Sequence, residues 1–300
     1  MARKILFFIN PVSGTHGKNE IEKKIVRNCN KYKIHYEILS TTPDGVYPFL
    51  SQKITTEQIT DVVICGGDGS LSPIVSSLFS ANVNFGIIPA GSGNGMAFSA
   101  KIPKSADKAL DIIFQGKASY VDAFIINGHL GCMLCGIGLD AQVAYDFSLQ
   151  AKRGLNTYLL QSLKNFVTAS SHKFKIEIND TSLEEDAFFV CIANSNQFGN
   201  NFTIAPQASL CDGLLDVIIV KKTTKLTVLW ALIKQVLAGQ LTRVSKKDFK
   251  KENILYLQAE KLRISNPGMA PLHIDGDPAE TAKAFDIKIL PKAFRLIQPQ

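Results

Sequence analysis

The sequence has no long hydrophobic run, and this absence excludes a helix that crosses a membrane. No stretch of its 300 residues reaches the roughly 18 consecutive apolar residues that span a bilayer. The first residues, Met1 to Lys4, lead directly into a short apolar stretch without the small-residue cleavage site of a signal peptide. We therefore expect a soluble, cytoplasmic protein.

Cysteine is sparse, and its spacing does not form a metal site. Of the six cysteines, Cys132 and Cys135 form a C-x-x-C pair, but no second pair follows at the spacing that zinc sites use. The pair lies in the apolar run 130–137, where strand alternation would turn the two thiols to opposite faces. Core packing is the main interpretation, and a zinc or redox role is the alternative.

The chain is basic but lacks a nucleic-acid-binding pattern. Its formal net charge is +7, yet it shows neither aromatic residues interleaved with basic ones nor a helix-turn-helix pattern. The basic residues gather in 221–251, which holds nine Lys or Arg and one acid beside an apolar helical stretch that contains Trp230. This pattern favours peripheral contact with an anionic membrane. A helix packed on the protein, with a solvated basic loop behind it, is the alternative.

The length and the hydrophobic pattern predict two domains. Residues 1–125 alternate apolar strands with helix-like stretches, which predicts an α/β domain with a parallel, Rossmann-like sheet. Residues 126–300 carry short strand-like runs linked by turns, which predicts an antiparallel β-sandwich. The expected strands are 4–9, 34–39, 61–65, 84–88, 174–178, 187–192, 215–220 and 262–264, and the expected helices are 18–30, 46–53, 71–80, 105–115, 151–168 and 225–238. Whether the last 10–15 residues return to the first domain is left open.

Three small-residue loops follow strands of the first domain. Residues 65–70 read Cys-Gly-Gly-Asp-Gly-Ser, residues 89–95 read Pro-Ala-Gly-Ser-Gly-Asn-Gly, and residues 10–14 read Asn-Pro-Val-Ser-Gly. Glycines let the backbone turn tightly and approach a ligand, and amides before a helix suit an oligophosphate. Because Asp68 would repel a bare phosphate, it points to a divalent metal or to proton abstraction from an attacking hydroxyl. Ligands of open parallel sheets bind at the carboxyl ends of the strands, where the three loops would meet.

In this order, these motifs resemble the nucleotide-binding signatures of the diacylglycerol kinase and sphingosine kinase superfamily. The resemblance continues along nearly the whole chain. Further motifs are Gly136-Ile-Gly-Leu-Asp-Ala141, Phe198-Gly-Asn200, Ala205-Pro206, Asp212-Gly-Leu-Leu-Asp216 and Ile274-Asp-Gly-Asp277. The resemblance implies a first domain like that of phosphofructokinases and NAD kinases, and an ATP-dependent lipid kinase that uses Mg²⁺.

The resemblance also implies which residues bind the nucleotide. They are Asn10, Thr41, Gly66, Gly67, Asp68, Gly69, Ser70, Ser92, Gly93 and Asn94. The assignment of Thr41 is based on its Thr-x-x-x-Gly spacing to Gly45.

Phosphoryl transfer also needs a base near the acceptor hydroxyl, and the aspartates 68, 122, 212, 216, 275 and 277 are the candidates. The resemblance favours Asp277, with Asp68 as the second choice. The family normally has Glu where this chain has Asp277, which moves the carboxylate back by about 1.5 Å. Gly95 is a second departure, since many bacterial members carry an acidic residue there.

A structural magnesium site is implied at the start of the predicted strand 215–220. Its ligands would be the Asp212 side chain and the backbone carbonyls near Leu215 and Val217, and oxygen ligands of this kind suit Mg²⁺. Asp216 belongs to the same motif, and Asp122 resembles the aspartate that links the interdomain hinge to this network. A simple turn before a strand is the alternative for Asp212.

The sequence defines the acceptor of the phosphoryl group less well than it defines the nucleotide donor. We expect transfer to a hydroxyl of diacylglycerol, a sphingoid base or a related lipid at a membrane surface. Two alternatives are kinase activity on a soluble acceptor, as in NAD kinases, and a catalytically weak lipid-binding regulatory protein. The oligomeric state stays open, with a homodimer among the alternatives.

Overall fold

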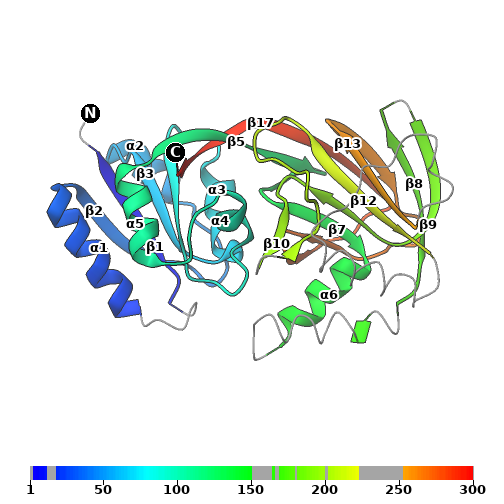
Figure 1. Cartoon of the computed structure of the whole chain (residues 1–300), viewed down its shortest axis with the longest axis horizontal. Coiled ribbons are helices and arrows are strands. Elements are labelled where there is room, and N and C mark those ends of the chain that lie inside the picture. The colour runs from blue at the N-terminus through cyan, green and yellow to red at the C-terminus, as the bar shows by residue number, and fades with distance from the viewer. Residues whose placement is uncertain are drawn as a thin grey trace. The chain divides into compact units, whose positions relative to one another are not determined.

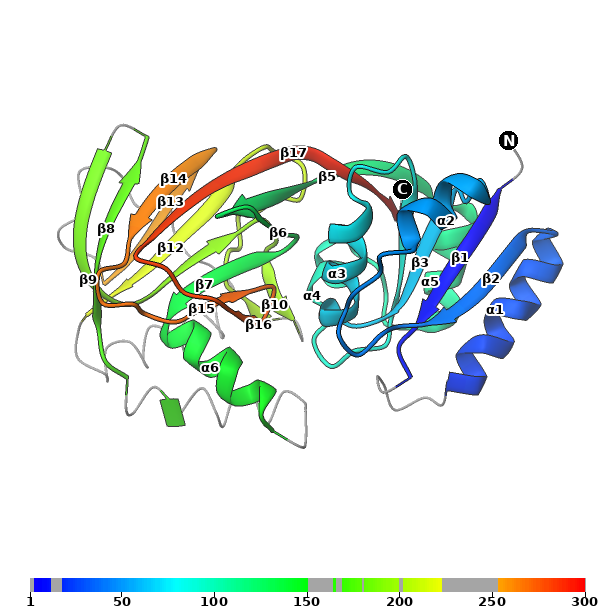
Figure 2. The ribbon, with the colours of Figure 1, turned by 180° about the vertical axis from the view of Figure 1, so that it is seen from behind.

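The structure is a computed structural model of the chain, and it describes residues 3–11, 18–150, 164–165, 169–179, 181–199, 202–222 and 253–299. Contacts divide the chain into two units. Unit 1 is Met1–Asp122 with Pro291–Gln300, and unit 2 is Ala123–Leu290. Figures 1 and 2 label the elements of both units.

Unit 1 is an α/β fold around a parallel sheet, as predicted. The strands lie in the order β4-β3-β1-β2, and all three pairings are parallel. All six residues of β3 are buried, which is typical of a central strand covered on both faces. The elements are β1 (Lys4–Ile9), α1 (Lys18–Tyr32), β2 (His35–Ser40), α2 (Leu50–Thr56), β3 (Asp61–Gly66), α3 (Asp68–Leu78), β4 (Asn84–Pro89), α4 (Gly95–Ser99), α5 (Ala106–Gln115) and β5 (Lys117–Ile126).

The winding of the chain changes direction between β1 and β3. From β1 the chain moves outward to β2, and it then crosses back so that β3 lies on the other side of β1. Helix α1 contacts α5, whereas α2 contacts α3, and the two pairs cover opposite faces of the sheet (Figures 1 and 2). Such a switch point opens a crevice at the carboxyl ends of the two strands.

Two helices of unit 1 begin at other residues than predicted. Helix α3 begins at Asp68 instead of residue 71, so the Asp-Gly-Ser of the glycine-rich loop forms its first turn. Helix α2 begins at Leu50 instead of residue 46. The backbone before α2 is held in a turn, because Val46 N donates to Asp44 Oδ1 at 3.1 Å.

Unit 2 is an antiparallel β fold around one hydrophobic core, in which β9 pairs with β7, β8 and β12. The predicted strands 174–178, 187–192, 215–220 and 262–264 all lie within observed strands. The elements are β6 (His129–Gly131), β7 (Leu134–Gly138), α6 (Leu139–Ser148), β8 (His172–Ile178), β9 (Thr181–Ala193), β10 (Gln197–Gly199), β11 (Phe202–Thr203), β12 (Leu215–Lys221), β13 (Ile254–Ala259), β14 (Lys261–Ser265), β15 (Leu272–Ile274), β16 (Asp277–Ala279) and β17 (Ala284–Gln298).

Several predicted segments fall outside the described residues. They are the helix 225–238, the helix 151–168 apart from residues 164–165, the basic segment 221–251 apart from its first two residues, residues 12–14 of the loop 10–14, and Asn200. Among the helices that the structure describes, none is both long and apolar enough to cross a bilayer.

The C-terminal strand β17 contributes to both units. Its first part pairs antiparallel with β14 in unit 2. Its last part lies in unit 1, where Arg295 and Leu296 pair in parallel with Asn84 and Phe85 of β4. Within unit 1, Lys292 N donates a 2.8 Å hydrogen bond to the buried Asp122 of β5, so this carboxylate holds the returning segment.

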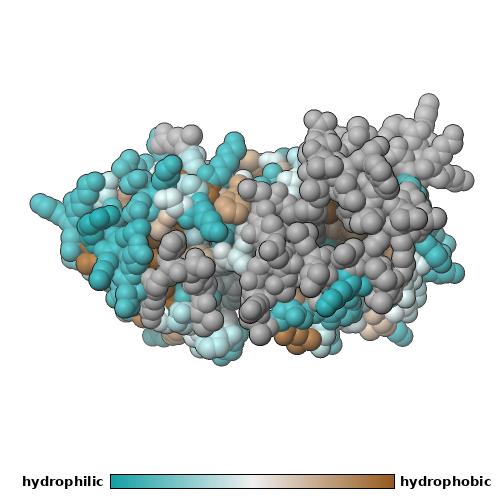
Figure 3. Space-filling model, turned by 60° about the horizontal axis from the view of Figure 1, so that its bottom comes forward, coloured by the Kyte–Doolittle hydropathy of each residue, from teal (hydrophilic) through white to brown (hydrophobic). Residues whose placement is uncertain are grey.

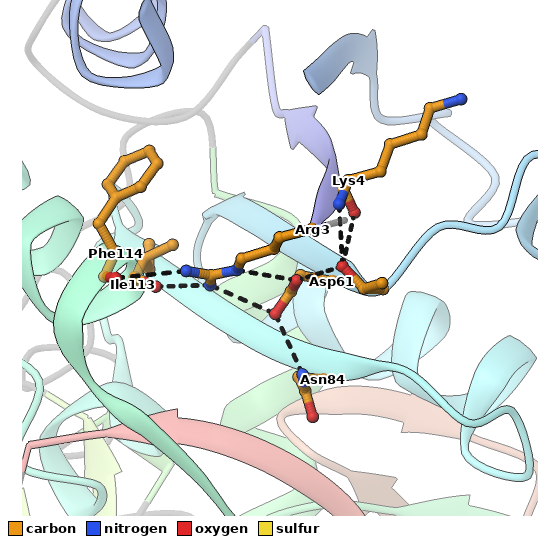
Figure 4. Close-up of polar contacts among 7 residues, drawn as sticks. Arg3, Lys4, Asp61, Asn84, Ile113 and Phe114 are labelled. Carbon is orange, nitrogen blue, oxygen red and sulfur yellow. Dashed lines mark hydrogen bonds and ion pairs between the residues drawn. The ribbon is translucent and has the colours of Figure 1, made fainter. Parts of the chain in front are cut away.

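A partly buried ion pair holds the amino-terminal edge of the unit 1 sheet (Figure 4). Arg3 Nε lies 3.0 Å from Oδ2 of Asp61, whose side chain is 2% exposed. The same guanidinium donates to the carbonyls of Ile113 and Phe114 at 2.6 and 3.3 Å, near the end of α5. Asn84 Nδ2 donates to Asp61 Oδ1 at 3.1 Å. The network therefore joins three strands to a helix at the edge opposite the glycine-rich loops.

The described surface carries few exposed large hydrophobic side chains. On the face shown in Figure 3, the described part of unit 1, at the left, is mainly hydrophilic. The exposed residues of this kind in the described part of the chain are Val46, Phe49, Tyr120, Tyr145, Leu149 and Met269.

Replacing Arg3 should destabilise unit 1. In Arg3→Ala the buried carboxylate of Asp61 loses its charged partner, and we expect the free energy of unfolding to fall by about 2 kcal/mol. Urea denaturation followed by circular dichroism measures this change. Arg27→Ala is the matched control, because its ion pair with Asp107 is exposed and contributes little. Equal midpoints for both variants would contradict this role of Arg3.

Candidate functional site

The predicted nucleotide-binding residues lie along the carboxyl edge of the unit 1 sheet. Asn10 follows β1, Thr41 follows β2, and the two glycine-rich loops follow β3 and β4. The backbone pairing continues past the strands, because Asn10 N donates to Cys65 O, Thr41 N to Ile9 O, and Ala90 N to Gly66 O, each at 3.0 Å. Unit 1 thus brings all these segments to one edge, which includes its switch point.

The two glycine-rich loops touch backbone to backbone. A Cβ added to Gly91 would lie 2.3 Å from the Cα of Gly67, and one added to Gly67 would lie 3.0 Å from the Cα of Gly91. A Cβ on Gly66 would meet Ser70 Oγ at 2.7 Å. A side chain at Gly91 would therefore push the two loops apart, and a side chain at Gly66 would displace Ser70 in its own loop, which is the physical reason for glycine at both positions.

Asp68 links the same two loops through its carboxylate. Gly95 N donates to Asp68 Oδ2 at 2.8 Å, and Met96 N donates to Oδ1 at 3.2 Å. The acid from the first loop thus accepts hydrogen bonds from the first amides of α4, which follows the second loop. Asp68 has a structural task, and its predicted part in proton transfer stays a prediction.

The polar side chains of the loops also bond to one another. Asn94 has a left-handed backbone (φ 58°), and its side chain both accepts from Gly91 N and donates to Gly91 O at 2.8 Å. Asn10 Nδ2 donates to Ser70 Oγ at 2.8 Å. Asn94 therefore holds the backbone of the second loop and Asn10 holds the side chain of Ser70, while Gly69 and Ser92 lie exposed.

The start of α3 offers donors for an anion. The amide of Gly69 lies in the first turn of this 11-residue helix, and no partner for it occurs among the described residues. Free amides and the positive end of the helix dipole both favour a phosphate group. Burial raises the pKa of the Cys65 thiol far above its usual range, so this cysteine stays neutral at the start of the loop.

In unit 2, Asp277 follows a two-residue β-turn. Strands β15 and β16 pair antiparallel, with Ile274 opposite Asp277, and the turn residues Asp275 and Gly276 have φ of 53° and 90°. Two positive φ values characterise the type I′ turn, for which Asp-Gly is a preferred sequence. Asp277 is exposed. Its carboxylate is therefore accessible to a reactant, as its predicted role requires.

Asp275, the neighbouring acid, is buried and structural. Its Oδ2 accepts from Cys132 N at 2.8 Å, and its Oδ1 accepts from Met133 N and Leu134 N at 2.8 and 3.1 Å. These bonds divide the apolar run 130–137 into β6 and β7, so the single strand-like run expected there is wrong. Because Cys132 lies between the two strands, the alternation argument does not apply to it, and both cysteines of the pair are buried.

The carboxylates of the predicted metal site have different surroundings. Asp212 is exposed, and its Oδ1 accepts from Leu214 N at 3.1 Å in a turn before β12. Asp216 is fully buried, and it accepts from Tyr256 Oη and, at 3.0 Å, from Gln258 Nε2.

The backbone carbonyls predicted for that metal site belong to residues in the first half of β12. Leu215 is its first residue, whereas Val217 pairs with β9 on one side and β13 on the other. An exposed carboxylate with nearby carbonyls is an oxygen donor set that fits Mg²⁺. In the described part of the chain, no cluster of three or more His, Cys, Asp or Glu could hold a metal ion. The magnesium site therefore stays a prediction that centres on Asp212.

The sequence interpretation missed a histidine next to the Asp277 turn. His273 of β15 is 1% exposed, and its Nε2 lies 3.1 Å from Oδ2 of Asp140, in the first turn of α6. Burial, and then the charges of Asp275 and Asp140, raise the pKa of the nearby Cys135 thiol. The only sequence signal was a histidine two residues before the Asp-Gly turn.

Two family models together match most of the chain. Residues 4–126 match the family model of the diacylglycerol kinase catalytic domain. Residues 134–298 match the model of the YegS C-terminal NAD kinase beta sandwich-like domain. The superfamily resemblance and the predicted fold class are thereby confirmed.

Individual relatives agree with the family models at low identity. A "Probable lipid kinase YegS-like" of Yersinia pestis is 23% identical over 96% of this chain and 95% of its own. An uncharacterized protein of Synechocystis is 25% identical over 97% of this chain and 69% of its own. The crystal structure of a diacylglycerol kinase from Bacillus anthracis has a TM-score of 0.77 at 20% identity, covering 99% of this chain and 97% of its own, and this shows the same fold.

Enlarging Gly91 should disrupt the loops. The Cβ of Gly91→Ala must displace the backbone of Gly67, and we expect a loss of about 1–3 kcal/mol in stability or in the free energy of ATP binding. Calorimetric titration with ATP and thermal unfolding measure the two quantities. Gly268→Ala is the matched control, because the nearest atom to its Cβ is His172 Nδ1 at 3.6 Å. Wild-type ATP affinity together with wild-type stability in Gly91→Ala would contradict the packing argument.

Proposed function

Because the chain belongs to the diacylglycerol kinase and sphingosine kinase superfamily, we propose that it is an ATP-dependent lipid kinase. The reaction would transfer the γ-phosphoryl group of ATP to a hydroxyl of diacylglycerol, a sphingoid base or a related lipid. The observation that carries the proposal is the backbone contact of Gly67 and Gly91 beside the open first turn of α3. Amides at the start of a helix suit an oligophosphate, and the contact brings the second loop close to the start of α3.

The nucleotide would bind at the carboxyl edge of the unit 1 sheet. Gly67 and Gly69 would approach the phosphates with their backbone, and Ser92 and Gly93 would do so from the second loop. Asn10 and Thr41 would border the same edge. Magnesium would neutralise charge on the phosphates, and a second ion held by Asp212 would stabilise the loop before β12.

Asp277 is the preferred general base. Its exposed carboxylate would accept the proton of the lipid hydroxyl while that oxygen bonds to the γ-phosphorus and the bond from phosphorus to ADP breaks. Asp68 is less suited, because both of its oxygens already accept backbone hydrogen bonds. A carboxylate that loses such bonds when it takes a proton is a poorer base.

The lipid would be reached from an anionic membrane surface. The sequence supports this step, because residues 221–251 hold nine basic residues and one acid. Each basic residue near such a surface contributes about 1 kcal/mol to binding. The protein would then be cytoplasmic with peripheral membrane association.

The direct test of the proposed function is transfer of radiolabel from ATP with Mg²⁺. Mixed micelles would contain diacylglycerol, monoacylglycerol, sphingosine or ceramide, with NAD as the soluble acceptor, and chromatography would separate the products. We expect one labelled lipid. Label on NAD alone, or on no acceptor although ATP binds, would contradict the lipid kinase proposal.

The same assay separates the two candidate bases. Asp277→Asn should lower kcat by about 10²- to 10⁴-fold and leave the KM for ATP unchanged, since general base catalysis contributes that much. Asp68→Asn should raise the KM for ATP and lower the melting temperature, because it disturbs the contact with α4. A fully active Asp277→Asn would overturn the assignment of the base.

Charge reversal in the basic segment should abolish vesicle binding. A variant with Glu at Lys246, Lys247, Lys250 and Lys251 should no longer sediment with anionic vesicles, while its ATP binding stays unchanged. A matched control carries Glu at four exposed lysines of unit 1, Lys23, Lys104, Lys108 and Lys117, and has the same net charge. If both variants sediment equally well, the segment is not the membrane contact.

A further inference from the structure

A buried acid and a histidine meet beneath the turn that carries Asp277. His273 Nε2 and Asp140 Oδ2 are 3.1 Å apart, and the two residues are 1% and 8% exposed. Their segments, β15 and the first turn of α6, are more than a hundred residues apart in the sequence. Neither side chain is accessible to a lipid or to a nucleotide.

The fold makes space for this contact at Gly136. In the sheet Gly136 lies opposite His273, on the neighbouring strand β7. A Cβ at Gly136 would lie 2.1 Å from Asp140 Oδ2 and 2.5 Å from His273 Nε2. Any other residue at this position would therefore push the acid and the imidazole apart.

The hydrogen bonds of the histidine define its tautomer. Gly276 N donates to His273 Nδ1 at 3.2 Å, so Nδ1 acts as an acceptor and carries no proton. The ring proton therefore lies on Nε2, which faces Asp140. Asp140 lies in the first turn of α6, where the helix dipole stabilises a negative charge. The carboxylate of Asp140, 3.1 Å from Nε2, lies beside the protonated nitrogen and favours this form electrostatically.

The turn is held from two sides, and Asp277 follows it directly. Asp275 binds three amides of the β6–β7 connection, and His273 binds the amide of Gly276. Gly276 has a φ of 90°, which glycine adopts readily, and in this conformation its amide donates to His273 Nδ1.

From this geometry we propose that Asp140 and His273 form a positioning pair that orients Asp277 for proton abstraction. The proposal rests on the proposed kinase function. In other enzymes, residues that do not touch the substrate hold catalytic groups in position. A displacement of a catalytic group by 1 Å can lower the rate about 10²-fold.

Two substitutions at His273 separate the two contacts. In His273→Asn the amide oxygen stands near the position of Nδ1 and can still accept from Gly276. In His273→Gln the amide group stands near Nε2 and can face Asp140, but the acceptor for Gly276 is lost. We expect His273→Gln to lower kcat about 10- to 100-fold with an unchanged KM for ATP, and His273→Asn to retain most of kcat. His129→Gln, at an exposed site in β6, is the control.

Equal losses of kcat in the Asn and Gln variants, or wild-type kcat in both, would overturn the proposal. Nitrogen NMR shifts of His273 in the wild-type protein test it without any substitution. A protonated Nε2 and a bare Nδ1 support it, and the opposite tautomer overturns it. This measurement needs no lipid substrate. If the wild-type protein labels no lipid, the proposed function fails, whereas the wrong tautomer in an active kinase rejects the positioning pair alone.

Discussion

The contact between Gly67 and Gly91 is the constraint on which the candidate site of unit 1 depends. The loops after β3 and β4 can touch only because neither residue carries a side chain. This approach lets the carboxylate of Asp68 reach the first amides of α4. The amide of Gly69 lies at the start of α3, without a partner among the described residues. The proposed anion-binding edge therefore depends on the absence of side chains at Gly67 and Gly91.

Burial sorts five of the six candidate aspartates into two groups, since Asp68 is only partly buried. Asp122, Asp216 and Asp275 are buried, and each accepts hydrogen bonds that fix a segment of the fold. Asp212 and Asp277 are exposed at turns, where a metal ion or a reacting hydroxyl can approach. The cost of desolvating a carboxylate explains this division, since a buried acid needs several donors to offset it. A list of acidic residues alone does not distinguish the two groups.

Much of the fold could be predicted from the sequence, because β1, β3 and β4 of unit 1 are apolar runs that each end in a loop of small residues. The parallel sheet and the glycine-rich edge follow from that local pattern. The start of α3 at Asp68 could not be predicted in this way, since the run Asp-Gly-Ser has no helical periodicity and depends on contacts across the sheet. The contacts of Asp275 and His273 could not be predicted from the local pattern either. Their partners, near residues 133 and 140, are distant in the sequence and leave no local signal.

The central claim is that the glycine-rich edge of unit 1 binds the phosphates of ATP. Amide NMR shifts of the ¹⁵N-labelled protein, titrated with a non-hydrolysable ATP analogue and Mg²⁺, test this claim most directly. The account predicts saturable shifts that are largest at the amides of Gly67, Gly69 and Gly91. Saturable shifts that leave these three amides unchanged, or no shifts at millimolar analogue, would contradict it.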